Sequence, residues 1–237
     1  GDLLTPECEI EYDQLVLSVG SQINDFGTKG VSKYAVSLDS FSHAVEFQKK
    51  LVNSFLKANA QLNQRKELSE HQLQLVIVGG GATGVELAAE LQNATKALVS
   101  YGYVALKDKK NINITLIEAN DRILRALPRR VSIAAKEILM NRGVNVLEAS
   151  KVSSVLPTKV VLEDGETIPS EIVVWAAGIK CSPFLSNLGL EVNELNQIIV
   201  RKTLQTKIDD SIFAIGDCAS CIWENGPQDF VPPRAQA

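Results

Sequence analysis

Mostly apolar runs and amphipathic stretches alternate through the middle of the chain. The apolar runs at residues 73–78, 112–118 and 144–148 have the length and composition of buried strands. Between them, apolar positions recur at helical spacing from about residue 83 and again over residues 129–141. This alternation predicts an α/β fold in which parallel strands are joined by right-handed crossover helices.

An antiparallel excursion is expected after the third of these strands. Residues 152–156 and 159–162 are strand-like and are separated by a short turn, which predicts a hairpin. The Asp164-Gly165 turn then leads into a short strand at residues 167–168, an arrangement typical of the middle of nucleotide-binding domains. Further strands are expected at residues 172–176, 198–201 and 211–215.

The amino-terminal part of the chain has a different pattern. Residues 7–19 alternate and then run apolar, as a bent strand or a pair of strands would. Residues 41–56 have helical spacing, which predicts an amphipathic helix of about 20 residues with Asp39 or Ser40 as its cap. The polar stretch at residues 59–72 is typical of a connector and indicates a domain boundary.

Composition and charge exclude several classes of function. The chain has 237 residues, of which 45% are hydrophobic and 22% charged, and its net charge is −4. Nucleic-acid binding requires many cations on one surface, and the sequence shows no such basic face. No run approaches the roughly 20 apolar residues that span a bilayer, and the first residues lack the pattern of a secretory signal.

Metal and disulfide chemistry have little support in the sequence. Four scattered cysteines favour a reducing compartment over a disulfide framework: Cys8, Cys181, Cys218 and Cys221. His43 and His71 lie far apart and form no metal-ligand pattern, so we expect no metal site. The C-x-x-C spacing of Cys218 and Cys221 leaves a redox dithiol or half a zinc site open.

The strongest motif is a glycine-rich turn after the strand at residues 73–78. Gly79, Gly81 and Gly84 form a G-x-G-x-x-G pattern that opens a helix, with Ala82 and Thr83 between the last two glycines. Gly79 allows a tight turn, Gly81 lets the backbone approach a pyrophosphate, and Gly84 lets the helix pack on the strand. Because unpaired helix N–H groups would face the phosphates, the motif predicts a dinucleotide site.

Glu118 ends the next predicted strand, where a carboxylate can accept both hydroxyls of an adenosine ribose. The same charge would repel a 2′-phosphate, so we expect NAD(H) to be preferred over NADP(H), although Arg122 four residues on could favour the phosphate. Glu118 also lies further from Gly84 than the roughly 20 residues that the motif usually needs. The intervening helix is therefore long, or residues 101–110 form an inserted loop.

Three shorter features lie at or near predicted element ends. Glu86 falls in the first helical turn after the glycines, where a helix-dipole role and a catalytic role both stay open. Residues 175–178 (Trp-Ala-Ala-Gly) end a buried strand in small residues, against which a flat ring could lie. Gly216 and Asp217 present a carboxylate at the end of another strand.

Together these segments resemble the type II, single-subunit NADH:quinone oxidoreductases. The likeness covers nearly the whole chain, and it is carried by residues 12–21, 79–90, 175–178, 215–217 and 232–237. In that family an NAD(H) domain is inserted into an FAD domain. The resemblance implies that Glu86 is a catalytic residue near the nicotinamide, with Ala177 and Gly178 in the loop beside it.

The same resemblance implies a flavin and a quinone. Gly216 and Asp217 would bind FAD, which Gly20 would approach from another strand end, and Gln236 would act at the quinone pocket. NADH would supply hydride to the flavin, and electrons would pass on to the quinone. The protein carrying this segment would be peripheral, at the cytoplasmic face of a membrane.

The resemblance also implies a domain plan. We expect a Rossmann-like NAD(H)-binding domain at residues 73–181, flanked by partial FAD-domain segments at residues 1–60 and 182–237. The rest of the FAD domain and the membrane-associating region would lie outside this chain, so we expect the chain alone neither to hold FAD tightly nor to reduce quinone. Strands without neighbours lead us to expect a homodimer or aggregation.

Two other functions stay open from the sequence. The first is a pyridine nucleotide–disulfide reductase that uses Cys218 and Cys221. The position of these cysteines disfavours it, because the working cysteines of such enzymes do not directly follow the Gly-Asp element. The second is a non-catalytic NAD(H)-binding module.

Overall fold

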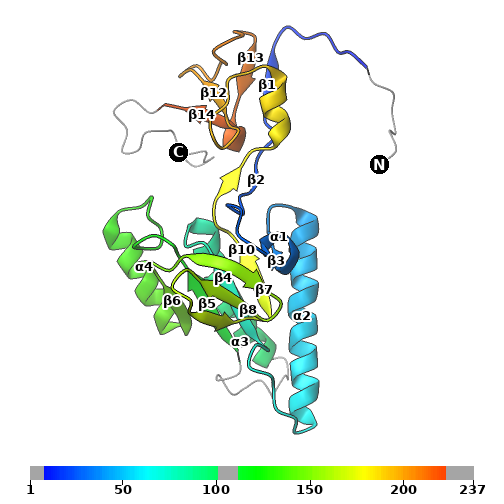
Figure 1. The fold of residues 1–237 in the computed structure, drawn as a ribbon, viewed down its shortest axis with the longest axis vertical. Helices are drawn as coiled ribbons and strands as arrows, with labels where there is room; N and C mark the ends of the chain where they lie inside the picture. Colours follow the sequence, from blue (N-terminus) through cyan, green and yellow to red (C-terminus); the bar gives the residue numbers. More distant parts are fainter. Residues whose placement is uncertain (1–7, 101–111, 223–237) are drawn as a thin grey trace. The chain divides into compact units, whose positions relative to one another are not determined.

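The computed structural model describes residues 8–100 and 112–222, which divide into two compact units (Figure 1). Unit 1 combines the two ends of the chain, up to residue 22 and from residue 179 onward, and unit 2 is the continuous segment 23–178. The short strands β2 (Gln22–Ile23) and β11 (Ile179–Lys180) lie where the chain passes between the units. In the described part of the chain, no helix has both the length and the hydropathy needed to cross a membrane.

A five-stranded parallel sheet forms the centre of unit 2. Its spatial order is β3 (Ala35–Val36), β10 (Ile172–Trp175), β4 (Gln74–Val78), β5 (Asn113–Ile117) and β6 (Val144–Leu147). Val78 is in register with both Trp175 and Ile117, so the carboxyl ends of the three central strands meet at one edge. The α/β fold with a parallel sheet is as predicted, and ligands of such open sheets bind at this edge.

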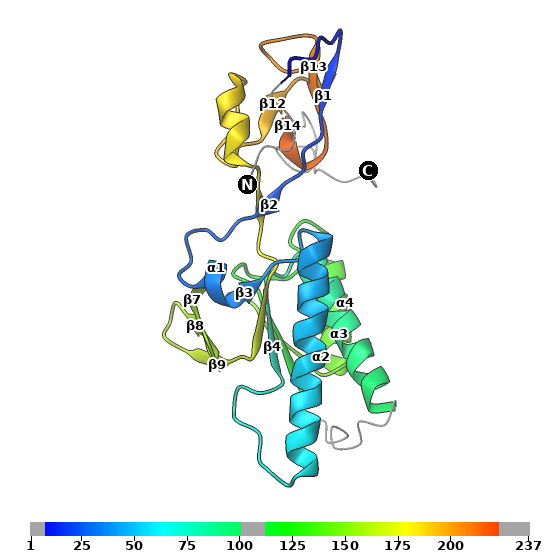
Figure 2. The same ribbon diagram turned by 90° about the vertical axis from the view of Figure 1, so that its right-hand side faces the viewer.

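Successive side chains along each strand face opposite layers. Leu75 and Ile77 of β4 pack with three helices, namely α2 (Phe41–Asn63), α3 (Ala82–Ser100) and α4 (Arg129–Asn141). Val76 and Val78 face the short helix α1 (Val31–Tyr34) and an antiparallel sheet of β7 (Val152–Leu156), β8 (Lys159–Leu162) and β9 (Thr167–Pro169). Figure 2 shows these two layers on opposite sides of β4.

Helix α2 is part of unit 2, although the sequence pattern predicted a boundary after it. Ser40 caps the helix by accepting a hydrogen bond from the N–H of His43 (3.2 Å). Phe47 and Phe55 on its buried face join the core that contains β4 and β10, while β3 extends the edge of the sheet. The compact units separate near residue 22, and the connector predicted at residues 59–72 lies within unit 2, where α2 covers one face of the parallel sheet.

Unit 1 is built on two pairs of parallel strands. β1 (Leu15–Leu17) pairs with β13 (Ile212–Ala214), and β12 (Ile198–Val200) pairs with β14 (Ala219–Cys221). The described part of this unit also contains the 3₁₀ helices η2 (Pro183–Leu188) and η3 (Gly216–Cys218). Within the described part of the segment expected to be a strand, residues 8–19, Leu15–Leu17 forms the strand that pairs with β13.

Candidate functional site

The glycine-rich turn lies between the end of β4 and the start of α3, at the edge where ligands are expected. Gly79 has φ 115°, which L side chains rarely adopt, and a Cβ there would lie 2.6 Å from the carbonyl of Ala176. A Cβ on Gly84 would lie 1.9 Å from the carbonyl oxygen of Gly79, so α3 rests directly on the turn. The fold itself therefore needs glycine at both positions.

Gly81 is free of such packing. A Cβ there would meet nothing within 4 Å, and Gly81, Ala82 and Thr83 are all exposed. Because α3 begins at Ala82, its first N–H groups have no acceptor within the helix. An open backbone surface at the positive end of a 19-residue helix fits the pyrophosphate of a dinucleotide.

Glu118 is held beside this turn. Its Oε2 accepts a hydrogen bond from the N–H of Gly80 (2.7 Å), and its Oε1 accepts from the backbone and side-chain amides of Asn120 (2.8 and 2.6 Å). These bonds place the carboxylate at the end of β5, next to the turn, where a ribose would be recognised. The predicted insertion at residues 101–110 lies outside the described residues.

The side chain of Arg122 is held by hydrogen bonds near the start of α4. Its guanidinium donates to the carbonyls of Arg125 and Leu127 (2.8 Å each) and to Oγ of Ser132 on α4 (2.6 Å). It also lines a cavity with residues of α4. Arg122 thus ties the loop after β5 to α4, and the alternative in which it reads a 2′-phosphate loses support.

The strand end at residues 175–178 adjoins the glycine turn. A Cβ on Gly79 would lie 2.6 Å from the carbonyl of Ala176 and 2.7 Å from the nitrogen of Ala177, so this backbone lies directly against the turn. Glu86 is exposed on α3, and among the described residues no hydrogen bond or ion pair holds it. The predicted residue Ala177 thus lies against Gly79 of the glycine turn, and the side chain of Glu86 is free to contact a ligand.

Residues 24–26 close this strand end, and the sequence pattern did not single them out. The indole Nε1 of Trp175 donates to the carbonyl of Asn24 (2.9 Å), and the N–H of Asn24 donates to the carbonyl of Gly178 (3.2 Å). The ring of Phe26 lies 2.7 Å from where a Cβ on Gly178 would stand. The only sequence signal is a turn-forming Asn-Asp-Phe-Gly stretch.

Unit 1 presents a second carboxylate. The parallel pairing of β1 with β13 brings Ser21 and Asp217 to the same sheet edge, where the hydroxyl of Ser21 donates to Oδ2 of Asp217 (2.6 Å). Gly20 and Gly216 have φ of 68° and 70°, and a Cβ on either would meet nothing within 4 Å. An acceptor next to open backbone fits a polyhydroxyl group such as the ribityl chain of a flavin. Gln236 lies outside the described residues.

Cys218 and Cys221 are not positioned to form a disulfide with each other. Cys218 immediately precedes β14 and Cys221 ends it, and three residues of extended chain place their Cα atoms on the order of 10 Å apart. A disulfide spans at most about 7 Å between Cα atoms. Cys218 is also buried, with its Sγ 3.3 Å from the carbonyl oxygen of Leu17. The disulfide-reductase alternative through these two cysteines therefore loses support.

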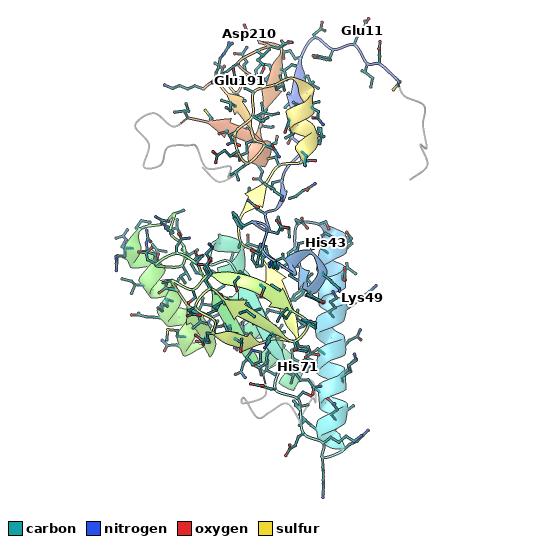
Figure 3. The ribbon with its side chains drawn as sticks, in the orientation of Figure 1. Glu11, His43, Lys49, His71, Glu191 and Asp210 are labelled. Carbon is teal, nitrogen blue, oxygen red and sulfur yellow. The ribbon has the colours of Figure 1, made fainter. Side chains whose placement is uncertain are left out.

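Of the two other cysteines, Cys8 is exposed and Cys181 is buried. Burial raises the pKa of the Cys181 thiol to about 11, with Cys218 and Asp217 adding to the effect. His43 stands near the start of α2, with its Nδ1 2.6 Å from Asp39 Oδ1, while His71 lies near the other end of unit 2 (Figure 3). Within residues 8–100 and 112–222, no group of three or more potential ligands could hold a metal ion.

Comparisons with known proteins agree with this geometry. The family model described as "Pyridine nucleotide-disulphide oxidoreductase" matches residues 4–237. A type II NADH:quinone oxidoreductase of Haemophilus influenzae is 44% identical, with the match covering 100% of this chain and 55% of the relative. A probable NADH dehydrogenase of Dictyostelium discoideum is 35% identical over 96% of this chain and 49% of its own length.

A solved structure shares the fold. NDH2 from Plasmodium falciparum in complex with NADH superimposes with a TM-score of 0.76 and 25% identity, covering 90% of this chain and 45% of that one. The chain thus spans about half the length of the curated relatives it matches.

Proposed function

This chain belongs to the family of pyridine nucleotide-disulphide oxidoreductases, and on that premise we propose that it forms the nucleotide-binding part of an NADH:quinone oxidoreductase. The names of the relatives from Haemophilus influenzae and Dictyostelium discoideum support the reaction, and the solved complex with NADH supports the nucleotide. The observation that carries the proposal is the open backbone at Gly81 with the carboxylate of Glu118 held beside it.

We propose a surface of unit 2 for each part of NADH. The pyrophosphate would lie on the N–H groups at the start of α3, next to Gly81 and Thr83. The adenosine ribose would hydrogen-bond to Glu118. The nicotinamide would lie against Ala177 and Gly178, with Glu86 as the catalytic carboxylate near it. All of these residues belong to one compact unit.

The flavin and quinone parts of the proposal have separate support. Asp217, with the neighbouring Gly216 and Gly20, would accept hydrogen bonds from FAD. A bound flavin would supply the redox chemistry that links a two-electron hydride donor to a quinone. Gln236 as a quinone-pocket residue stays a prediction from the family resemblance, as do membrane association and a homodimer.

Binding of NADH to the purified chain tests the proposal. Titration would follow tryptophan emission and energy transfer to the reduced nicotinamide, with calorimetry as a second readout. Trp175 is 3% exposed and is the last residue of β10, two residues before Ala177, where the nicotinamide is proposed to lie, so we expect saturable quenching by NADH. Trp175→Phe should remove most of the energy transfer and keep the calorimetric signal.

A control variant in unit 1 tests whether NADH binding belongs to unit 2 alone. Asp217→Asn changes a carboxylate of unit 1 and should leave the Kd for NADH unchanged, because the proposed NADH residues all lie in unit 2. A folded chain that shows no saturable NADH binding in either readout would refute the proposed function.

A further inference from the structure

Arg125 lies next to the position proposed to recognise the adenosine ribose. Its Nη1 donates to the side-chain carbonyl of Asn120 (2.7 Å), and the amide of the same Asn120 donates to Glu118 (2.6 Å). Glu118 in turn accepts from the N–H of Gly80 in the glycine turn. A continuous chain of hydrogen bonds therefore links Arg125 through Asn120 and Glu118 to the turn.

The backbone keeps Arg125 close to the turn. Leu124 has φ 51°, uncommon for a residue other than glycine, and its N–H donates to the carbonyl of Gly80 (2.7 Å). The preceding residue, Ile123, is fully buried, and its N–H donates to the carboxylate of Glu148 (3.0 Å). These contacts fix the backbone before and at the bend, so Arg125 directly follows an anchored part of the loop.

The guanidinium of Arg125 is available to a ligand. The side chain is exposed, and no carboxylate forms an ion pair with it in the described part of the chain. Arg122, by contrast, donates to three acceptors around the start of α4. A planar guanidinium can donate two parallel hydrogen bonds to a phosphate, which the compact ammonium of lysine cannot do.

We propose that Arg125 determines how well this site accepts NADPH, by pairing with the 2′-phosphate after release from Asn120, while Glu118 favours the free ribose hydroxyls of NADH. The inference rests on the proposed function of the glycine turn. On this proposal, the carboxylate of Glu118 favours NADH and the guanidinium of Arg125 favours NADPH. In the free protein, both groups are hydrogen-bonded to Asn120.

The test compares the Kd values of NADH and NADPH for single variants of the whole chain at two salt concentrations. Arg125→Ala should raise the Kd for NADPH about tenfold or more, as expected for loss of a charged hydrogen bond, and change the Kd for NADH less than about twofold. Arg125→Lys should give an intermediate Kd for NADPH. Arg142→Ala is the matched control: Arg142 is exposed just before β6, at the opposite edge of the sheet, and its loss should change neither Kd.

A double variant sharpens the test. Glu118→Gln removes the repulsion and should improve NADPH binding, and most of that gain should vanish when Arg125→Ala is added. An unchanged NADPH-to-NADH ratio in Arg125→Ala, an equal weakening of both nucleotides, or wild-type protein that binds NADH without measurable NADPH binding would each overturn the inference and leave the proposed function standing. Wild-type protein that binds neither nucleotide would overturn both.

Discussion

At the scale of single residues, Gly81 and Gly84 belong to one motif but have different tasks. A Cβ on Gly84 would overlap the carbonyl oxygen of Gly79, so this glycine serves the packing of α3 on the turn. A Cβ on Gly81 would enter open space, so nothing in the described structure requires glycine there. The requirement at Gly81 arises only when a ligand approaches the backbone.

The two alanine variants should therefore fail in different ways. Gly81→Ala should change the free energy of unfolding by less than about 0.5 kcal/mol and weaken NADH binding at least about tenfold, because the methyl group occupies the proposed pyrophosphate position. Gly84→Ala should lower the free energy of unfolding by about 2 kcal/mol or more, because backbone atoms must move to relieve the overlap. Denaturant unfolding and NADH titration measure both effects. Normal NADH binding by Gly81→Ala would place the pyrophosphate elsewhere.

At the scale of elements, patterns that depend on local chemistry were predictable. The bounds of α4 and of the β7–β8 hairpin follow from periodicity and turn residues, and the structure has them at the predicted residues. Helix α2 was also predicted, but its apolar face does not specify which layer covers it. The packing of Phe47 and Phe55 against β4 and β10, together with the pairing of the two-residue strand β3 with β10, shows that α2 belongs with the parallel sheet.

The sequence also predicts some parts of the candidate site and not others. The proximity of Glu118 to the glycine turn could be predicted, because neighbouring parallel strands end at one edge. The position of Arg125 could not, because it depends on a left-handed bend at Leu124, a residue type that carries no signal for such a bend. Arg122 was the more evident cation from sequence, and only its hydrogen bonds to Leu127 and Ser132 show that it is engaged.

An ion pair between two elements should make unit 2 sensitive to acid. Glu148, which follows β6, lies 2.6 Å from Nζ of Lys136 on α4 and accepts from the N–H of Ile123. Burial acts to raise the pKa of Glu148, but the bonds from Lys136 and Ile123 outweigh it and hold the pKa below its usual value. A lowered pKa stabilises the fold above about pH 4.3, the usual glutamate pKa, and this contribution is lost as the pH falls further.

Glu148→Gln should therefore be less stable than the wild-type chain at pH 7, and the difference in free energy of unfolding should narrow as the pH falls below about 4.3. Denaturant unfolding at a series of pH values measures it. Glu46→Gln is the control: Glu46 pairs with Lys50 on the surface of α2, with both side chains at least half exposed, so its removal should have a much smaller effect. A stability difference for Glu148→Gln that stays constant from pH 7 to below about pH 4.3 would contradict the role of the ion pair.

At the scale of the whole chain, unit 2 is one continuous segment between the two parts of unit 1. Every residue proposed to contact NADH lies in that segment, whereas Asp217 and the cysteines at 181, 218 and 221 lie in unit 1. A shorter protein should therefore bind NADH only if it contains all of the elements that unit 2 needs to fold. The question is whether α2 and β3 are among those elements.

Two shorter proteins would measure that contribution. Residues 23–178 should unfold cooperatively and bind NADH within about threefold of the whole chain, a change of less than about 0.7 kcal/mol. Residues 73–181 would lack Phe47 and Phe55, which are 8% and 2% exposed, and also the Asn24 carbonyl that accepts from Trp175. Loss of one buried phenylalanine costs about 3–5 kcal/mol, against a total stability of about 5–15 kcal/mol, so this shorter protein should show no cooperative thermal transition by circular dichroism.

If residues 73–181 melt like residues 23–178, α2 and β3 are dispensable to the unit. If residues 23–178 fold but do not bind NADH, part of the site lies in unit 1.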